Sequence, residues 1–166
     1  MPFLPFSTLS NNSRIWIFSS NRELSAAESE MLMTEVGSFL QNWTAHKVET
    51  TASADLRYNR FLIIGADEDV AKPGGCSIDE MTRRVRMLGE TYGVEFIGMP
   101  RVDYRDPSGA IQSISRMEFQ KQVDNKEVNS STIVFDNTLT MLSDLQNGKW
   151  ELPASESWHA RAFELY

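Results

Sequence analysis

The chain has 166 residues, of which 41% are hydrophobic and 23% charged, and its 23 acidic and 16 basic residues give a net charge of −7. This length and composition suit one folded domain and exclude a disordered or fibrous chain. The negative charge repels phosphate backbones and anionic lipids, so we expect no nucleic-acid partner. No apolar run approaches the roughly 18 residues that a spanning helix needs, so we expect no membrane partner either.

The N-terminal residues and the cysteine content bear on the compartment. The first ten residues contain two prolines and no basic flank, and their apolar run is too short for a secretory signal. The single cysteine, Cys76, excludes an intramolecular disulfide, and a free thiol suits a reducing compartment. We therefore expect the protein to be cytoplasmic.

A β-branched run and a capping box predict the first two elements. Residues 14–19 are a short β-branched and aromatic run between polar residues, which is typical of a buried strand. Ser25 and Glu28 have the spacing of a capping box, and apolar residues follow at helical intervals. We expect a helix over residues 26–42.

A second capping box predicts the next helix. The loop 71–75 contains proline and two glycines and breaks the chain. Ser77 and Glu80 then repeat the capping-box spacing, and apolar residues follow at intervals of three and four. We expect this helix to start with Ser77 as its N-cap and to end before Gly93, a residue suited to terminate a helix.

Three further segments complete the predicted sheet. Residues 47–53 are extended and polar, residues 58–65 contain a continuous apolar run, and residues 94–97 form a short apolar stretch. The resulting order, βαββαβ over residues 1–98, is the ferredoxin-like pattern, in which two helices pack on one face of an antiparallel sheet. The predicted fold class is therefore α+β.

The remainder of the chain is predicted as a C-terminal extension over residues 99–166. No linker or repeat separates it from the core, so we expect a single domain over residues 1–166. Its expected elements are a hairpin of residues 101–105 and 110–114 around the turn 106–109, a helix from 115 to about 123, a strand over 132–135, a helix over 138–146, and a docked aromatic-rich arm over 150–159.

Four sequence blocks carry a resemblance along nearly the whole chain: Asn42–His46, Tyr58–Phe61, Gly75–Asp79 and Pro153–His159. In these blocks the chain resembles an uncharacterised family of small proteins from Bacteroidetes, whose members are often labelled ABC transporter ATPases. An ATPase of that class needs a G-x-x-x-x-G-K-[S/T] loop to bind phosphates, and the sequence contains none. We therefore expect that the protein is not an ATPase, and the resemblance implies no mechanism.

Cys76 is the residue with the clearest chemical potential. It precedes a predicted helix, whose free N–H groups and positive dipole end could stabilise a thiolate. The two histidines, His46 and His159, are candidate bases, and Asp79 could orient one of them or act as a dipole partner in the first turn. These residues are the candidates for a thiol-dependent enzyme or a redox sensor.

A structural interpretation of the same residues is favoured. With Ser77 as N-cap, Cys76 and Met81 have the spacing of a hydrophobic staple, so we expect Cys76 to be packed. His46 follows the first helix, where a cation offsets the dipole. The sequence has no C-x-x-C or H-E-x-x-H pair, so neither a metal site nor another cofactor is predicted.

Aromatic residues give a third candidate site. Trp43, Trp150 and Trp158 could line a pocket for a flat or aliphatic ligand, with Asn59 and Arg60 at its edge. Core packing is favoured for Trp43, which completes the apolar stripe of the first helix. Trp158 stands in a polar run and is typical of a residue that anchors an arm to its own domain or to a neighbouring subunit.

The sequence leaves three functions open. The favoured one is a small binding or interaction protein without catalytic activity, a homodimer whose sheet face or C-terminal arm forms the interface. The second is a thiol-dependent enzyme or redox sensor that uses Cys76 with His46 or His159. The third is a small-ligand binder with an aromatic-lined pocket.

Overall fold

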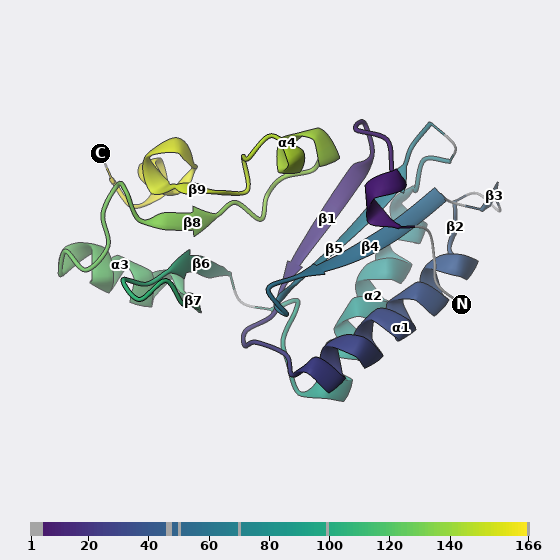
Figure 1. Cartoon of the computed structure of the whole chain (residues 1–166), viewed down its shortest axis with the longest axis horizontal. Coiled ribbons are helices and arrows are strands. Elements are labelled where there is room, and N and C mark those ends of the chain that lie inside the picture. Colours follow the sequence, from purple (N-terminus) through teal and green to yellow (C-terminus); the bar gives the residue numbers. More distant parts are fainter. Residues whose placement is uncertain (1–4, 46–47, 50, 70, 99, 166) are drawn as a thin grey trace. The chain divides into compact units, whose positions relative to one another are not determined.

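The computed structural model covers the whole chain and describes residues 5–45, 48–49, 51–69, 71–98 and 100–165 (Figure 1). Contacts group the chain into two compact units, Met1–Ile97 with Thr140–Ser143, and Gly98–Leu139 with Asp144–Tyr166. Antiparallel sheets and helices occur in both, so the protein is α+β. The expectation that residues 1–166 form a single domain stays a prediction.

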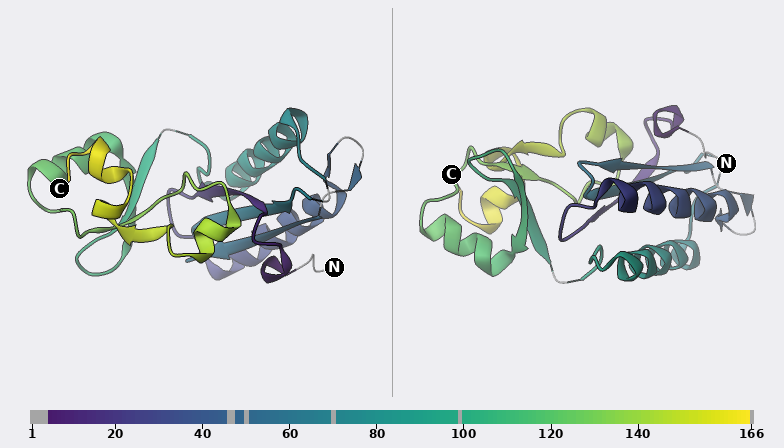
Figure 2. Two further views of the ribbon diagram at one scale, coloured as in Figure 1. Left: turned by 90° about the horizontal axis from the view of Figure 1, so that it is seen from above. Right: turned by 60° about the horizontal axis from the view of Figure 1, so that its bottom comes forward.

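The first unit is a three-stranded antiparallel sheet with order β1-β5-β4, covered on one face by two helices (Figures 1 and 2). A separate two-stranded sheet pairs β2 with β3. The elements are η1 (Phe6–Thr8), β1 (Arg14–Ser19), α1 (Ala26–Asn42), β2 (Thr44–Ala45), β3 (Val48–Glu49), β4 (Thr51–Arg57), β5 (Phe61–Asp67) and α2 (Gly75–Tyr92).

Helix α1 begins and ends where the sequence predicts, because its capping box forms. Ser25 Oγ accepts a hydrogen bond from the Glu28 backbone N–H at 3.1 Å, and Glu28 Oε1 accepts one from the Ser25 N–H at 2.8 Å. Arg22 also donates to Glu28, and these hydrogen bonds lower the pKa of Glu28 to about 2. Arg22 further donates to the Tyr92 carbonyl at 2.8 Å, which links the start of α1 to the end of α2.

Helix α2 starts three residues earlier than the sequence predicts. Gly74 is its N-cap, so the predicted Ser77 cap is wrong. Ser77 is buried inside the helix, and its carbonyl accepts a hydrogen bond from Trp43 Nε1 at 2.9 Å. Glycine is an accepted N-cap residue, so Gly74 can cap a helix whose first turn extends back to the loop. The predicted end is confirmed, with Gly93 at a φ of 67°.

The predicted strand over residues 94–97 does not form. The chain instead folds back onto α2, where Val94 N–H donates to the Gly89 carbonyl at 2.9 Å. Val94 and Phe96 are buried in the core between the helices and the sheet, so they cannot extend beside β1. Residues 1–98 therefore do not complete the predicted four-stranded sheet.

A later segment lies beside the open edge of β1. Residues 140–143 belong to the first unit, and Met141 forms an antiparallel bridge with Arg14. The Ile15 N–H donates to the Thr140 carbonyl at 3.0 Å, beside that bridge. This edge of β1 is thus paired, although by a segment far away in the sequence.

The second unit is an antiparallel sheet with order β7-β6-β8-β9 (Figure 1). The predicted hairpin and the strand before α4 are confirmed, and α4 is shorter than predicted. The elements after residue 98 are β6 (Arg101–Arg105), β7 (Ile111–Ser115), α3 (Arg116–Asp124), β8 (Ile133–Phe135), α4 (Leu142–Gln146), β9 (Glu151–Pro153), η2 (Ala154–Glu156) and α5 (His159–Ala162).

The C-terminal segment supplies much of the second unit's core. Strand β9 pairs with β8, and Ala154, Phe163 and Leu165 are buried together with Val102 and Phe119. The segment is thus an integral part of this unit rather than a detachable arm. No helix in the described ranges is long and apolar enough to cross a membrane.

We predict that Gly89→Ala destabilises the protein, although alanine normally favours a helix interior. A Cβ at Gly89 would lie 2.8 Å from the Val94 carbonyl oxygen and 3.2 Å from Phe96 Cδ2, so backbone would have to shift. We expect a loss of about 1–3 kcal/mol in the free energy of unfolding, measured by urea titration. The matched variant Gly75→Ala meets no atom within 4 Å and should be nearly neutral; equal effects would contradict the prediction.

Candidate functional site

Cys76 is exposed, so the prediction that it is packed is wrong. The staple requires a residue outside the helix, whereas Cys76 is the second residue of α2. Met81, its expected partner, is fully buried in the core below. The earlier helix start therefore converts a predicted packing residue into a surface thiol. His46, the first candidate base, lies outside the described residues.

His159 is a packing residue of the second unit. Its ring is only 1% exposed and stacks on Trp158 at a centroid distance of 3.8 Å. Its Nδ1 shares a hydrogen bond with Ser157 Oγ at 2.8 Å. Burial is the main cause that lowers the pKa of His159 to about 4, against an opposing effect of the Asp136 charge. The imidazole is therefore neutral at pH 7 and engaged by its own neighbours.

Each of the three tryptophans is packed within its own unit. Trp43 is 1% exposed, as expected for core, and meets Trp16 edge-on at 6.0 Å. Trp150 is 4% exposed and donates to Asn137 Oδ1 at 2.9 Å. Trp158 lies under the Arg116 guanidinium at 5.0 Å, which agrees with its expected role as an anchor.

Asn59, Arg60 and Asp79, the other residues predicted to contact a ligand, do not come together in one site. Asn59, with a φ of 53°, lies in the β4–β5 turn, where its Oδ1 accepts from Ser29 Oγ at 3.3 Å. The Arg60 carbonyl accepts from the Ser20 N–H at 2.9 Å in the same turn. Asp79 is exposed on α2. The turn residues thus hold the sheet to the start of α1 rather than line a pocket.

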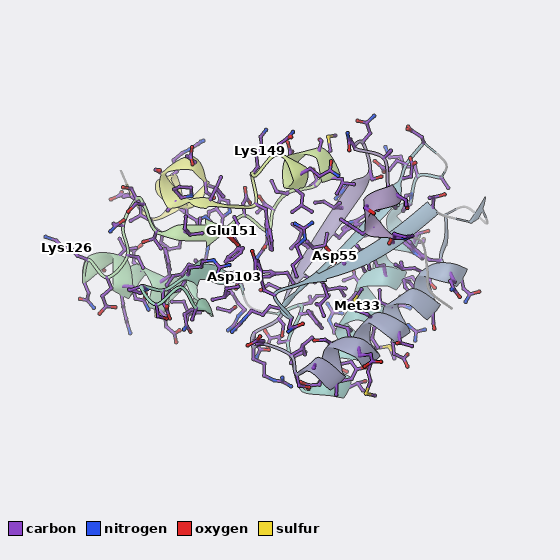
Figure 3. The ribbon with its side chains drawn as sticks, viewed as in Figure 1. Met33, Asp55, Asp103, Lys126, Lys149 and Glu151 are labelled. Atoms are coloured by element: carbon purple, nitrogen blue, oxygen red, sulfur yellow. The ribbon has the colours of Figure 1, made fainter. Side chains whose placement is uncertain are left out.

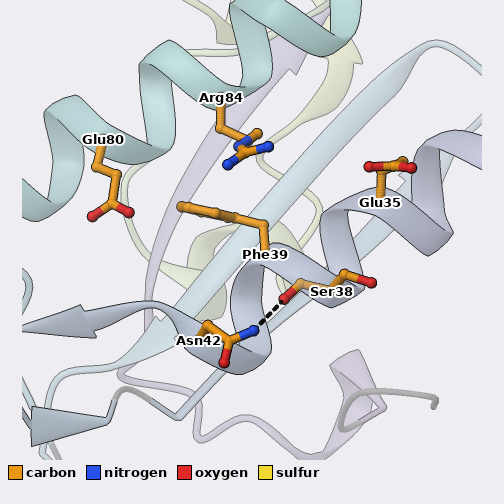
Figure 4. A pocket seen from close by; sticks show the side chains of 6 residues that line it. All are labelled: Glu35, Ser38, Phe39, Asn42, Glu80 and Arg84. Atoms are coloured by element: carbon orange, nitrogen blue, oxygen red, sulfur yellow. Dashed lines mark hydrogen bonds between the residues drawn. The ribbon is translucent and has the colours of Figure 1, made fainter.

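A pocket of about 250 Å³ lies between α1 and α2, at residues that the sequence analysis did not select (Figure 4). The contributing positions of α1 have spacings of three and four and so form one face of that helix. The two contributing positions of α2 are one turn apart. The lining residues are Glu35, Ser38, Phe39 and Asn42 from α1, and Glu80 and Arg84 from α2.

The pocket combines an aromatic ring, Phe39, with three charged side chains. The Arg84 guanidinium carbon lies 5.7 Å from the centre of the Phe39 ring, a cation–π distance. Figure 4 shows Glu80 and Glu35 on opposite sides of this pair. Within the described ranges, the charged ends of these three ionic residues form no hydrogen bond or salt bridge. The arrangement can therefore bind a ligand through charge and through contact with the ring.

Comparison of the chain with protein-family models, with curated proteins and with solved structures gave no match. The resemblance to the Bacteroidetes family therefore stays a prediction.

A second polar cluster lies on the sheet of the second unit, where Figure 3 labels Asp103 and Glu151. Asp103 is 2% exposed; its Oδ2 accepts from Asn137 Nδ2 at 2.6 Å, and its Oδ1 is buried without a hydrogen-bond partner. Arg105 donates to Glu151 at 3.1 Å. Asp103 alternates with Val102 and Tyr104, so the sequence pattern indicates a solvent-facing residue and gives no sign of this burial.

The buried imidazole makes stability depend on pH. The pKa of His159 is lower in the folded protein than in the unfolded chain, so the unfolded chain binds the proton first as pH falls. The stabilisation by neutral His159 is thus present at pH 7 and falls between pH about 6.5 and about 4, by on the order of 3 kcal/mol.

Urea unfolding of the wild type and His159→Phe at pH 7, 5.5 and 4.5 measures this effect. Phenylalanine keeps the ring packing and cannot titrate, so the wild type should lose stability relative to the variant as pH falls. A pH-independent difference between the two proteins would contradict the prediction.

Proposed function

We propose that this protein is a small cytoplasmic binding protein without catalytic activity, and that it acts as a homodimer. The net charge of −7 supports a partner other than nucleic acid. The observation that carries the proposal is the outer edge of β4. In the described part of the chain, β4 pairs with β5 alone and is therefore an edge strand of the three-stranded sheet, the position at which a further strand can add.

Strand β4 has few of the features that prevent edge pairing. It is seven residues long and lacks proline and lysine, which commonly protect edges. Its first four residues have small side chains, which permit close approach. At its end, Arg57 pairs with Asp55 at 3.0 Å, and both side chains are partly exposed. This charged pair is the edge's main polar feature.

A two-fold arrangement of two β4 strands matches this sequence. With Ala54 beside the partner's Ala54, all seven residues pair antiparallel, and Ser53 faces the partner's Asp55. A register centred on Asp55 places like charges directly opposite each other and is disfavoured. The two sheets would form one continuous sheet of six strands.

The remaining topology is consistent with this interface. We propose a ferredoxin-like relationship for the first unit, supported by the order β1-β5-β4 and by two helices on one face. Residues 140–143 lie at the β1 edge, where the fourth strand of that fold would stand. The C-terminal arm is less suited to form the interface, because its apolar residues are buried in the core of its own unit.

Sedimentation velocity over a range of concentrations tests the dimer. In the dimer of the Asp55→Lys variant, each β4 strand contributes the new lysine and Arg57 to the paired edges. Repulsion between these like charges should raise the dissociation constant of the dimer at least tenfold. Asp79→Lys makes the same change of net charge on exposed α2 and should leave the dimer intact. A wild type that sediments as a monomer at about 100 μM, or equal effects of the two variants, would refute this interface.

The exposure of Cys76 favours a second candidate, a redox-sensing or catalytic thiol. Cys76 lies in the first turn of an 18-residue helix that has no acidic residue in that turn, so the helix dipole favours negative charge there. The buried His159 is not suited to act as its base.

Alkylation by iodoacetamide separates the two functions. Because Cys76 is exposed, native protein should react within about tenfold of the rate of urea-denatured protein. Unreactivity before denaturation would contradict the exposure. A thiol function further requires that Cys76 is alkylated faster in the native protein than in the denatured chain near neutral pH. If the alkylation rates of the two forms depend on pH in the same way, a thiol function is excluded.

A further inference from the structure

We propose that the pocket between α1 and α2 binds a free basic α-amino acid, such as lysine. Binding of this ligand is independent of self-association through β4. Its six lining residues come from two helices that are held side by side by hydrogen bonds near both ends. The site is therefore built on rigid elements.

The charges of the pocket define the ligand. Glu35 and Glu80 supply two carboxylates and Arg84 supplies one guanidinium. A complementary ligand has two cationic groups and one anionic group, which is the charge pattern of a basic amino acid. Its carboxylate would meet Arg84, the natural partner of a planar anion, and its two ammonium groups would meet the two glutamates.

The position of Phe39 selects a long side chain. Figure 4 shows the Phe39 ring between Glu35 and Glu80, so a ligand that reaches both carboxylates must cross the ring. The methylene groups of lysine would lie on the part of this ring that the Arg84 guanidinium does not cover, while its two ammonium groups meet the two glutamates. A compact amino acid with one ammonium group cannot reach both ends.

The size of the pocket limits the ligand class. Pockets for drug-sized ligands are about 300–1,000 Å³, and the volume here is about 250 Å³. A nucleotide is too large for this space, and its phosphates would be repelled by two carboxylates. A ligand of amino-acid size fits, with an expected dissociation constant on the order of 1 mM.

Titration of the ¹⁵N-labelled protein with L-lysine tests the site. We expect saturable shifts of amide signals in α1 and α2. Norleucine lacks the side-chain ammonium and cadaverine lacks the carboxylate, so each should bind about tenfold more weakly. Absence of saturable shifts up to about 20 mM lysine, or equal binding of norleucine, would overturn the proposal.

Matched variants locate the binding. Glu80→Gln should weaken lysine binding about tenfold, whereas Asp79→Asn removes the same charge from the neighbouring exposed position and should have no effect. Arg84→Gln should weaken lysine binding but not cadaverine binding. Equal effects of the Glu80 and Asp79 variants would overturn the site. Circular dichroism verifies that each variant is folded, and sedimentation of the same samples reports the β4 interface separately.

Discussion

The hydrogen bond from Trp43 to the Ser77 carbonyl is the contact on which the arrangement of the first unit depends. It joins the end of α1 to the start of α2, while Arg22 joins the opposite ends through the Tyr92 carbonyl. A buried indole N–H needs an acceptor, so this contact fixes where α2 packs. Because the two helices are fixed in this way, the exposed stripe of α1 faces that of α2, and the charged pocket forms between them.

A close backbone approach sets the extent of the sheet. Gly89 lacks a side chain, so the Val94 carbonyl can lie against α2. As a result, Val94 and Phe96 are buried in the core. The chain therefore leaves the first unit without adding a strand to β1. Residues 140–143 later pair with that edge, so within the described ranges β4 is the other edge strand of the sheet. The self-association proposed for this protein follows from that asymmetry.

The candidate site residues fall into a buried group and an exposed group. Burial makes His159 a neutral packing group, and it makes Trp43 and Trp150 hydrogen-bonded core residues. Among the described site residues, the Cys76 thiol and the charged ends of Glu35, Glu80 and Arg84 lie on the surface of the helices.

The elements whose signals are local could be predicted from the amino-acid sequence alone. The Ser25–Glu28 capping box, the glycine after α2 and the turn between β6 and β7 are each complete within a few residues, so the chain forms them wherever it is packed. The start of α2, the pairing of the β1 edge, the burial of Asp103 and the pocket could not be predicted in this way. These depend on contacts between distant residues, such as Trp43 and Ser77, which are 34 positions apart, and no local pattern specifies which distant partner a side chain meets.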